Sequence, residues 1–218
     1  MGSLEEATLT FYHMNKCPFS GPIKLLLAHR NFKYTDVGIR YSDWLLMREE
    51  LITARVPALR IQHYNGKLEW MTEANAIMRC LGEQYNLLGR TDMDKFYCDR
   101  IIGKIQESGY LLQDYFKYRK YHQDDEDDHK AYKEKFFNEI SVILADLDRM
   151  LVETKGEYAA SSDVTIADFY LLDFIDFLRA NKPECLEPYP SLNKWRKYLM
   201  DNNQSIARYT ASRSWLLI

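Results

Sequence analysis

The sequence predicts an α/β domain with a four-stranded sheet over residues 1–87, followed by an all-helical domain over 93–218. Three observations support this division. Strand-like and helix-like segments alternate through the first 87 residues. The dipeptide Asn65-Gly66, a strong hairpin signal, joins the last two strand-like segments. Beyond residue 92 the strand-like segments stop, and apolar repeats of helical period replace them.

The first domain begins with a strand, a helix, a strand and a helix. Residues 7–14 are rich in threonine and aromatic residues and predict a strand. Pro18 predicts the start of a helix that ends near Asn31, because a proline in the first turn removes no helical hydrogen bond. A second strand over 32–39 and a short helix over 42–51 follow.

The remaining segments complete the sheet. Residues 57–71 predict two strands around the hairpin turn, and residues 73–85 predict a helix whose apolar face buries Ile77, Cys80 and Leu81. The first β-α-β unit implies a right-handed parallel crossover, and the hairpin adds an antiparallel edge. A four-stranded mixed sheet with helices on both faces is the thioredoxin-like arrangement.

The second domain is predicted to contain only helices. The clearest are expected over residues 93–121, 130–154 and 165–180. The third is apolar on nearly all sides, so we expect it to be central, with Thr165 and Asp168 forming a capping box at its start. The acidic segment 122–129 predicts a solvated turn rather than a metal site, because calcium loops need a specific ligand spacing and a turn glycine.

Composition narrows the possible partners and setting. The chain has 218 residues and a formal net charge of −3, which gives no electrostatic case for binding nucleic acid or an anionic membrane. No run of apolar residues is long enough to span a bilayer, and the N-terminus does not resemble a secretory signal. The cysteines are too scattered for a disulfide framework or a paired metal motif. We therefore expect a cytoplasmic protein without a metal, with Cys98 and Cys185 buried.

Four stretches, taken in order, resemble motifs of one family. They are Val56-Pro57, "EANAI" at 73–77, "VTIADFYLLDFIDF" and "PECLEPYPSLNKW". The first two are similar to a cis-proline step and a ligand-clasping turn, and the last two to segments of the mu and sigma classes. The chain thus resembles the cytosolic glutathione transferases over essentially its whole length. This resemblance implies the fold predicted above, glutathione as co-substrate, a role in detoxification or redox chemistry, and a homodimer.

The resemblance also implies which residues bind glutathione. Trp44 matches the site tryptophan, and Arg48 stands where mu and sigma members carry a lysine for the glycyl carboxylate. The backbone of Val56, before Pro57, would pair with the extended tripeptide. Glu73 matches the acidic member of the E-S-x-A-I motif and would accept the γ-glutamyl ammonium.

One residue departs from the family pattern. Ala74 replaces the serine of that motif, so a hydroxyl donor to the γ-glutamyl carboxylate is lost, worth about 1.5–3 kcal/mol if the bond is charge-assisted. The backbone N–H of residue 74 remains. Asp99 matches an aspartate that dimeric members lend to the neighbouring site, and Tyr110, Tyr115 and Tyr118 fall where the family has its second-substrate pocket.

Two residues compete for the role of activating the thiol. Cys17, in "CPFS", resembles the cysteine of omega-class members and dehydroascorbate reductases without a gap. Tyr12 resembles the first-strand tyrosine of the mu and sigma classes, but this match requires a gap. A helix N-terminus and Lys16 would favour the Cys17 thiolate. Ser20 replaces the second cysteine of a dithiol motif, so the expected intermediate is a mixed disulfide with glutathione, resolved by a second glutathione.

Three functions remain open on these grounds. The first is glutathione-dependent thiol transfer or reduction through Cys17, with some conjugation. The second is conjugation or isomerisation through Tyr12. The third is a non-catalytic ligand-binding or structural protein of the same fold, which the loss of the serine at Ala74 favours.

Overall fold

The computed structural model describes residues 4–14, 20–40, 42–51, 55–121 and 126–213. The described chain divides into two compact units. The first comprises residues 4–87 together with 203–213, and the second comprises residues 88–202. The sequence assigned everything after residue 93 to the helical domain, whereas in the structure the C-terminal helix groups with the first unit.

A four-stranded mixed sheet forms the centre of the first unit. Its strands lie in the order β2-β1-β3-β4. Their bounds are β1 Thr8–Met14, β2 Tyr34–Ile39, β3 Ala58–Gln62 and β4 Leu68–Thr72. Strand β1 pairs in parallel with β2 and antiparallel with β3, and β3 pairs antiparallel with β4. The predicted parallel crossover and antiparallel hairpin are both confirmed.

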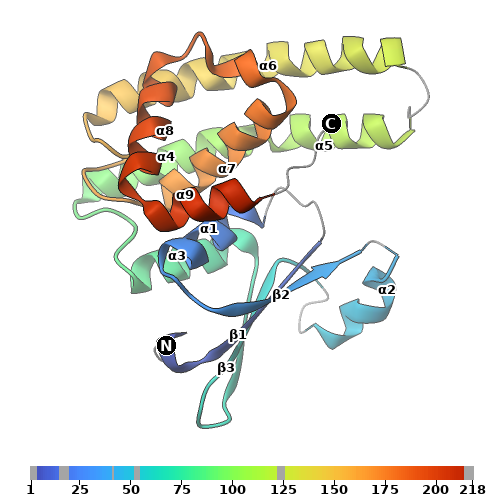
Figure 1. The fold of residues 1–218 in the computed structure, drawn as a ribbon, viewed down its shortest axis with the longest axis vertical. Coiled ribbons are helices and arrows are strands. Elements are labelled where there is room, and N and C mark those ends of the chain that lie inside the picture. Colours follow the sequence, from blue (N-terminus) through green and yellow to red (C-terminus); the bar gives the residue numbers. More distant parts are fainter. Residues whose placement is uncertain (1–3, 15–19, 41, 52–54, 122–125, 214–218) are drawn as a thin grey trace. The chain divides into compact units, whose positions relative to one another are not determined.

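Helices and short turns flank this sheet. They are η1 Leu4–Glu6, α1 Gly21–His29, α2 Trp44–Met47, η2 Arg48–Glu50, α3 Ala74–Gln84 and α9 Gln204–Ser212. Helices α1 and α3 contact each other, and α9 packs on α1, whereas α2 lies apart from them beyond the end of β2 (Figure 1). In the described residues α1 begins at Gly21, with Ser20 as its N-cap and Pro22 in its first turn, whereas the sequence predicted a start at Pro18. Pro18 itself lies outside the described residues.

Successive side chains of β1 point to opposite faces of the sheet, and the two faces differ in burial. Leu9 and Phe11 are fully buried on one face, as are their partners across the sheet, Ile61 and Leu59. Tyr12 points to the opposite face, where its ring contacts a ring of β4. The core of the first unit therefore lies on the Phe11 face.

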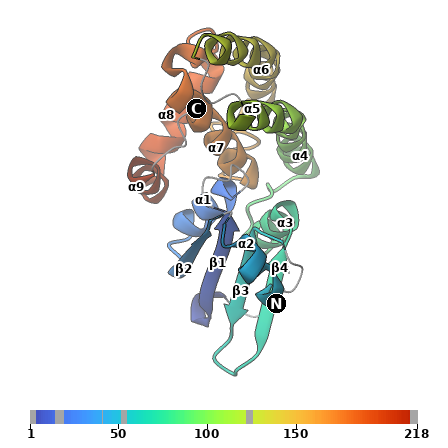
Figure 2. The ribbon, with the colours of Figure 1, turned by 90° about the vertical axis from the view of Figure 1, so that its right-hand side faces the viewer.

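The second unit contains only helices in its described part. They are α4 Asp92–Glu107, α5 Gly109–Tyr121, α6 Glu126–Thr154, α7 Ile166–Asn181, η3 Pro183–Leu186 and α8 Pro190–Asn202. Helices α5 and α6 run side by side (Figures 1 and 2). Among the described residues, no helix has the length and apolar character needed to cross a bilayer.

Two predictions about these helices are corrected. The single helix expected over 93–121 is interrupted at Ser108, whose hydroxyl donates to the carbonyl of Ile105 at 2.6 Å, and Gly109 begins the next helix. A serine that bonds back to the helix, followed by a glycine of low helix propensity, favours such a break. The acidic segment is not wholly a turn, because α6 already begins at Glu126.

Asp168 stabilises the centre of the second unit. Its carboxylate is fully buried and accepts bonds from the backbone N–H and hydroxyl of Thr165, which confirms the predicted cap. It also accepts from the N–H of Ala159 and the indole of Trp195, each at 2.8 Å. Burial raises the pKa of Asp168, while the donors act in the opposite direction. One carboxylate thus ties α7 to the preceding loop and to α8.

We expect Asp168→Ala to lower the free energy of unfolding by about 3 kcal/mol, because several buried donors would lose their acceptor. Asp94→Ala is the matched control. Asp94 closes the same Thr-x-x-Asp motif at Thr91, but the site is exposed and its carboxylate accepts from the backbone N–H groups of Arg90 and Thr91 before α4. Its loss should cost about 1 kcal/mol. Chemical denaturation measures both values, and equal costs would contradict the central role of Asp168.

Candidate functional site

A cleft of about 340 Å³ opens at one end of the sheet in the first unit. Its described lining consists of Met14, Trp44, Arg55, Val56, Pro57 and Glu73. Four of these were predicted as ligand-binding residues, and the structure brings them together. Met14 and Arg55 were not predicted.

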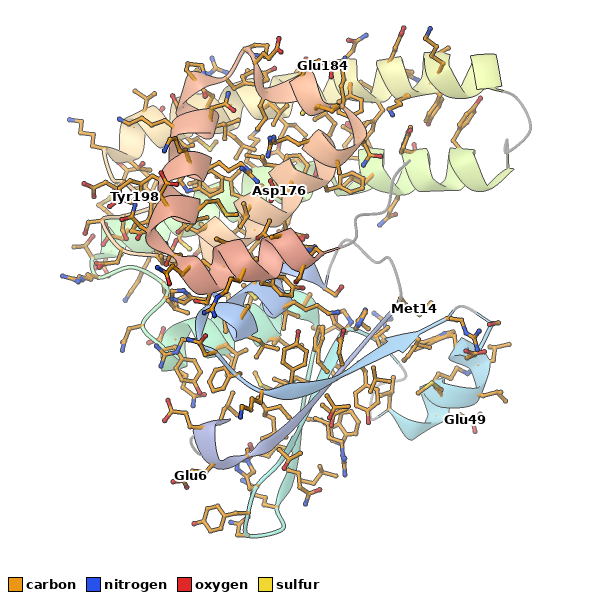
Figure 3. The ribbon with its side chains drawn as sticks, in the orientation of Figure 1. Glu6, Met14, Glu49, Asp176, Glu184 and Tyr198 are labelled. Atoms are coloured by element: carbon orange, nitrogen blue, oxygen red, sulfur yellow. The ribbon has the colours of Figure 1, made fainter. Side chains whose placement is uncertain are left out.

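Strand register explains why these residues meet. Tyr12, Ala58 and Thr72 stand opposite one another on β1, β3 and β4. This row is the last complete one before the cleft. Pro57 precedes Ala58, Glu73 follows Thr72, and Met14 lies at the end of β1 (Figure 3). Chain segments far apart in sequence therefore leave the sheet side by side.

The Val56–Pro57 peptide bond is cis, as predicted. It lies immediately before β3, at the wall of the cleft. The backbone of Val56 precedes the first residue of β3 that pairs with β1. An extended ligand backbone placed here would continue the hydrogen-bonding pattern of the sheet.

Glu73 has an unusual backbone conformation at the cleft. It is the N-cap of α3, with φ 66° and ψ 110°. The other described non-glycine residues with positive φ, which are Asn31, Asn86 and Lys155, all follow the end of a helix. Glu73 instead precedes one, in a region of φ/ψ space that costs a side-chain-bearing residue about 1–3 kcal/mol. Such a strained residue is typical of functional sites.

The start of α3 is suited to an anion. No side chain caps it, so the first backbone N–H groups, beginning at Ala74, are not used by a cap. Together with the helix dipole, these groups favour a carboxylate. Ala74 is the first residue of α3, directly after Glu73.

Arg55 adds a positive charge that the sequence did not identify. Its guanidinium lies 4.0 Å from the Glu73 carboxylate, and both side chains are largely exposed, at 75% and 64%. From the sequence, Arg55 would be expected to be a solvated charge in a loop. Only the fold shows that it lies beside Glu73. The cleft therefore carries one exposed cation, one exposed carboxylate and a helix start without a side-chain cap at Glu73.

The other predicted binding residues lie elsewhere. Arg48 is exposed at the start of η2, one turn beyond Trp44, and is not among the described lining residues. Asp99 lies on α4 in the second unit. Tyr110 lies on α5 and is 66% exposed.

Tyr115 and Tyr118 lie in the aromatic packing between α5 and α6. Tyr115 is fully buried, with its ring centre 4.7 Å from that of Phe136. Tyr118 stacks on Tyr132 at 3.8 Å with an interplanar angle of 3°. Tyr115 therefore offers no exposed surface to a ligand, and Tyr110 is the more accessible residue.

Neither predicted thiol-activating residue lies among the described lining residues of the cleft. Tyr12 lies on the same strand as Met14, but its ring stands 5.6 Å from that of Trp70 on β4. Cys17 lies outside the described residues. In sequence it precedes the N-cap Ser20 of α1 by three positions.

The described cysteines are not suited to thiol chemistry, with one exception. Burial raises the pKa of Cys98 to about 12 and that of Cys185 to about 11, so both remain protonated at neutral pH. Cys80 is exposed, and its predicted burial is wrong. Met78 takes the buried position on α3 beside Ile77 and Leu81.

Comparison with known proteins identifies a consistent set of relatives. Residues 110–213 match the family described as "Glutathione S-transferase, C-terminal domain". The "Glutathione S-transferase class-mu 28 kDa isozyme" of Schistosoma bovis is 27% identical over 193 residues, which cover 88% of this chain and 89% of that protein. Human "Hematopoietic prostaglandin D synthase" is 26% identical over 180 residues, covering 80% of this chain and 81% of that protein. The solved structure titled "Fasciola hepatica sigma class GST" shares the fold, with a TM-score of 0.84 at 23% identity over 97% of this chain and 99% of that one.

Proposed function

We propose that this chain is a cytosolic glutathione transferase that conjugates the thiol of glutathione to small electrophiles. The observation that carries the proposal is the cleft in which the Val56–Pro57 bond faces Glu73 and the uncapped start of α3. Glutathione is an extended tripeptide with one ammonium, two carboxylates and a thiol. Its ammonium and its carboxylates have chemically matched partners in this cleft.

The γ-glutamyl end would bind at Glu73. The exposed carboxylate of Glu73 attracts the ammonium, and the first N–H groups of α3 attract the neighbouring carboxylate. The backbone of Val56 would pair with the cysteinyl residue. Arg55, in the cleft lining, is the candidate cation for the glycyl carboxylate, and Arg48, in η2, is the second candidate.

In the proposed reaction, the glutathione thiolate attacks an electrophilic carbon. A carbon–sulfur bond forms, and either a leaving group departs with its electron pair or the electron pair of a double bond takes up a proton. Tyr12 is the candidate donor to the thiolate, and Tyr110 is a candidate contact for the electrophile. The similarity to a mu-class transferase supports conjugation as the main chemistry.

Thiol transfer through Cys17 is the second candidate, and the ungapped "CPFS" sequence favours it. The Cys17 thiolate would attack the glutathione sulfur of a glutathionylated substrate, forming a Cys17–glutathione disulfide, and the substrate thiolate would leave. A second glutathione would then attack the mixed disulfide, releasing glutathione disulfide and the free Cys17 thiolate.

Two variants separate the conjugation and thiol-transfer routes. If Cys17 is the nucleophile, Cys17→Ser should abolish reduction of a glutathionylated substrate, because a serine without a base is a poor nucleophile. Tyr12→Phe should then change neither that reaction nor the conjugation of an aromatic halide. Steady-state rates in both assays measure this. Loss of conjugation in Tyr12→Phe, with normal rates in Cys17→Ser, would instead assign the chemistry to Tyr12.

Restoring the family's serine tests the helix start of α3. Ala74→Ser should tighten glutathione binding by about tenfold, since a hydroxyl bond to a carboxylate contributes about 1.5 kcal/mol. Ala76→Ser, at an exposed position in the same helix turn, is the control and should leave the affinity unchanged. Calorimetric titration measures both. If neither serine changes the affinity, the γ-glutamyl carboxylate does not bind at Ala74.

We also propose a homodimer that uses the outer face of α4. Met93 and Phe96 are each 54% exposed on this helix, one turn apart, and Asp99 follows after another turn. Light scattering at micromolar concentration should give twice the 25.9 kDa of one chain. Phe96→Glu should shift the mass toward one chain, because a charge in an apolar interface is costly to desolvate. A one-chain mass for the unchanged protein would contradict the dimer.

A further inference from the structure

A cluster of three charged or titratable side chains lies behind the cleft. His13, next to Met14 on β1, is buried, with 9% of its side chain exposed. Its Nε2 lies 2.9 Å from the ammonium of Lys24 on α1 and 3.0 Å from the carboxylate of Asp36 on β2. Lys24 also donates to Asp36 at 2.7 Å. The cluster thus joins three elements of the first unit at the carboxyl end of β1.

The hydrogen bonds define the orientation of the imidazole. The Nδ1 atom of His13 lies 3.0 Å from the backbone carbonyl of Met14, which can only accept, so Nδ1 must carry a proton. Nε2 points the other way, toward the ammonium of Lys24, which can only donate, and the carboxylate of Asp36, which can only accept. The two ring nitrogens therefore have different partners, and the partner of Nδ1 is the backbone of the residue that lines the cleft.

Ring packing also restrains His13. Its ring stacks on Phe11 at 5.6 Å, and the Lys24 ammonium lies 5.9 Å from the centre of the Phe11 ring. Phe11 is fully buried. The imidazole is therefore fixed by its stacking partner as well as by its two charged neighbours.

We propose that His13 is a positioning residue for glutathione, whose Nδ1–H holds the carbonyl of Met14 while Lys24 and Asp36 hold the ring. Met14 is the point at which β1 enters the cleft lining, so its orientation sets one wall of the site. This inference rests on the proposed function. It adds a role for His13, which does not line the cleft in the described residues but binds the backbone of Met14, which does.

Two substitutions at His13 separate the roles of the ring nitrogens. Asparagine places an amide donor near the position of Nδ1, whereas glutamine places its polar atoms near Nε2. We expect His13→Gln to weaken glutathione binding about fivefold, the effect of losing one hydrogen bond. His13→Asn should weaken it less, because a donor to Met14 remains. Lys24→Met should also weaken glutathione binding, since the His13 ring loses a partner that holds it in place.

The hairpin between β3 and β4 provides a matched control. There His63 lies 3.0 Å from Glu69, which also pairs with Lys67, and the side chain of His63 is 10% exposed. This cluster also joins a histidine, a carboxylate and a lysine, but its members are not among the described lining residues of the cleft. His63→Gln should lower the melting temperature without changing glutathione affinity.

Titration of tryptophan fluorescence with glutathione measures the affinities, because Trp44 lines the cleft. The expected order of affinity is the unchanged protein and His63→Gln, then His13→Asn, then His13→Gln, with melting temperatures recorded for each. If His13→Gln does not fold, Lys24→Met against His63→Gln decides the same question. Equal affinity of both His13 variants and the unchanged protein would overturn the positioning role. Failure of the unchanged protein to bind glutathione would overturn the proposed function itself.

Discussion

The antiparallel pairing of β3 with both β1 and β4 is the constraint on which the cleft depends. It places Tyr12, Ala58 and Thr72 in one row, so that the segments beyond this row must leave the sheet together. The Val56–Pro57 bond and Glu73 are the first features on two of these segments. A shift of one residue in either register would turn the side chains to opposite faces and move Glu73 away from Pro57. The site is therefore a consequence of sheet register rather than of any local motif.

Polar side chains with several partners each then join the elements around the cleft and those at the centre of the second unit. In the first unit, His13, Lys24 and Asp36 join β1, α1 and β2 close to the cleft. In the second, the fully buried Asp168 joins the start of α7 to the preceding loop and to α8. Such a network favours one arrangement of its members, because a polar group that loses its partner there carries a desolvation cost. Stability of the helical unit and affinity at the cleft should thus respond to different substitutions.

Much of this architecture was predictable from the sequence, because it depends on local signals. The hairpin at Asn65-Gly66 and the capping box at Asp168 are examples. The helical period of apolar residues did not show which side chains of α3 are buried, and Met78 rather than Cys80 lies in the core. It also missed the break at Ser108, where two short-range preferences interrupt a continuous apolar pattern.

The candidate site was predictable only in part. Trp44, Val56, Pro57 and Glu73 were expected and do meet at the cleft. Arg55 and His13 were missed because their significance depends on partners that are distant in sequence. The most direct test of the glutathione cleft is calorimetric titration with glutathione and with cysteinylglycine, which lacks the γ-glutamyl group. The account predicts one glutathione per chain and much weaker binding of the dipeptide. Equal affinity for the two, or no heat with glutathione at millimolar concentration, would contradict it.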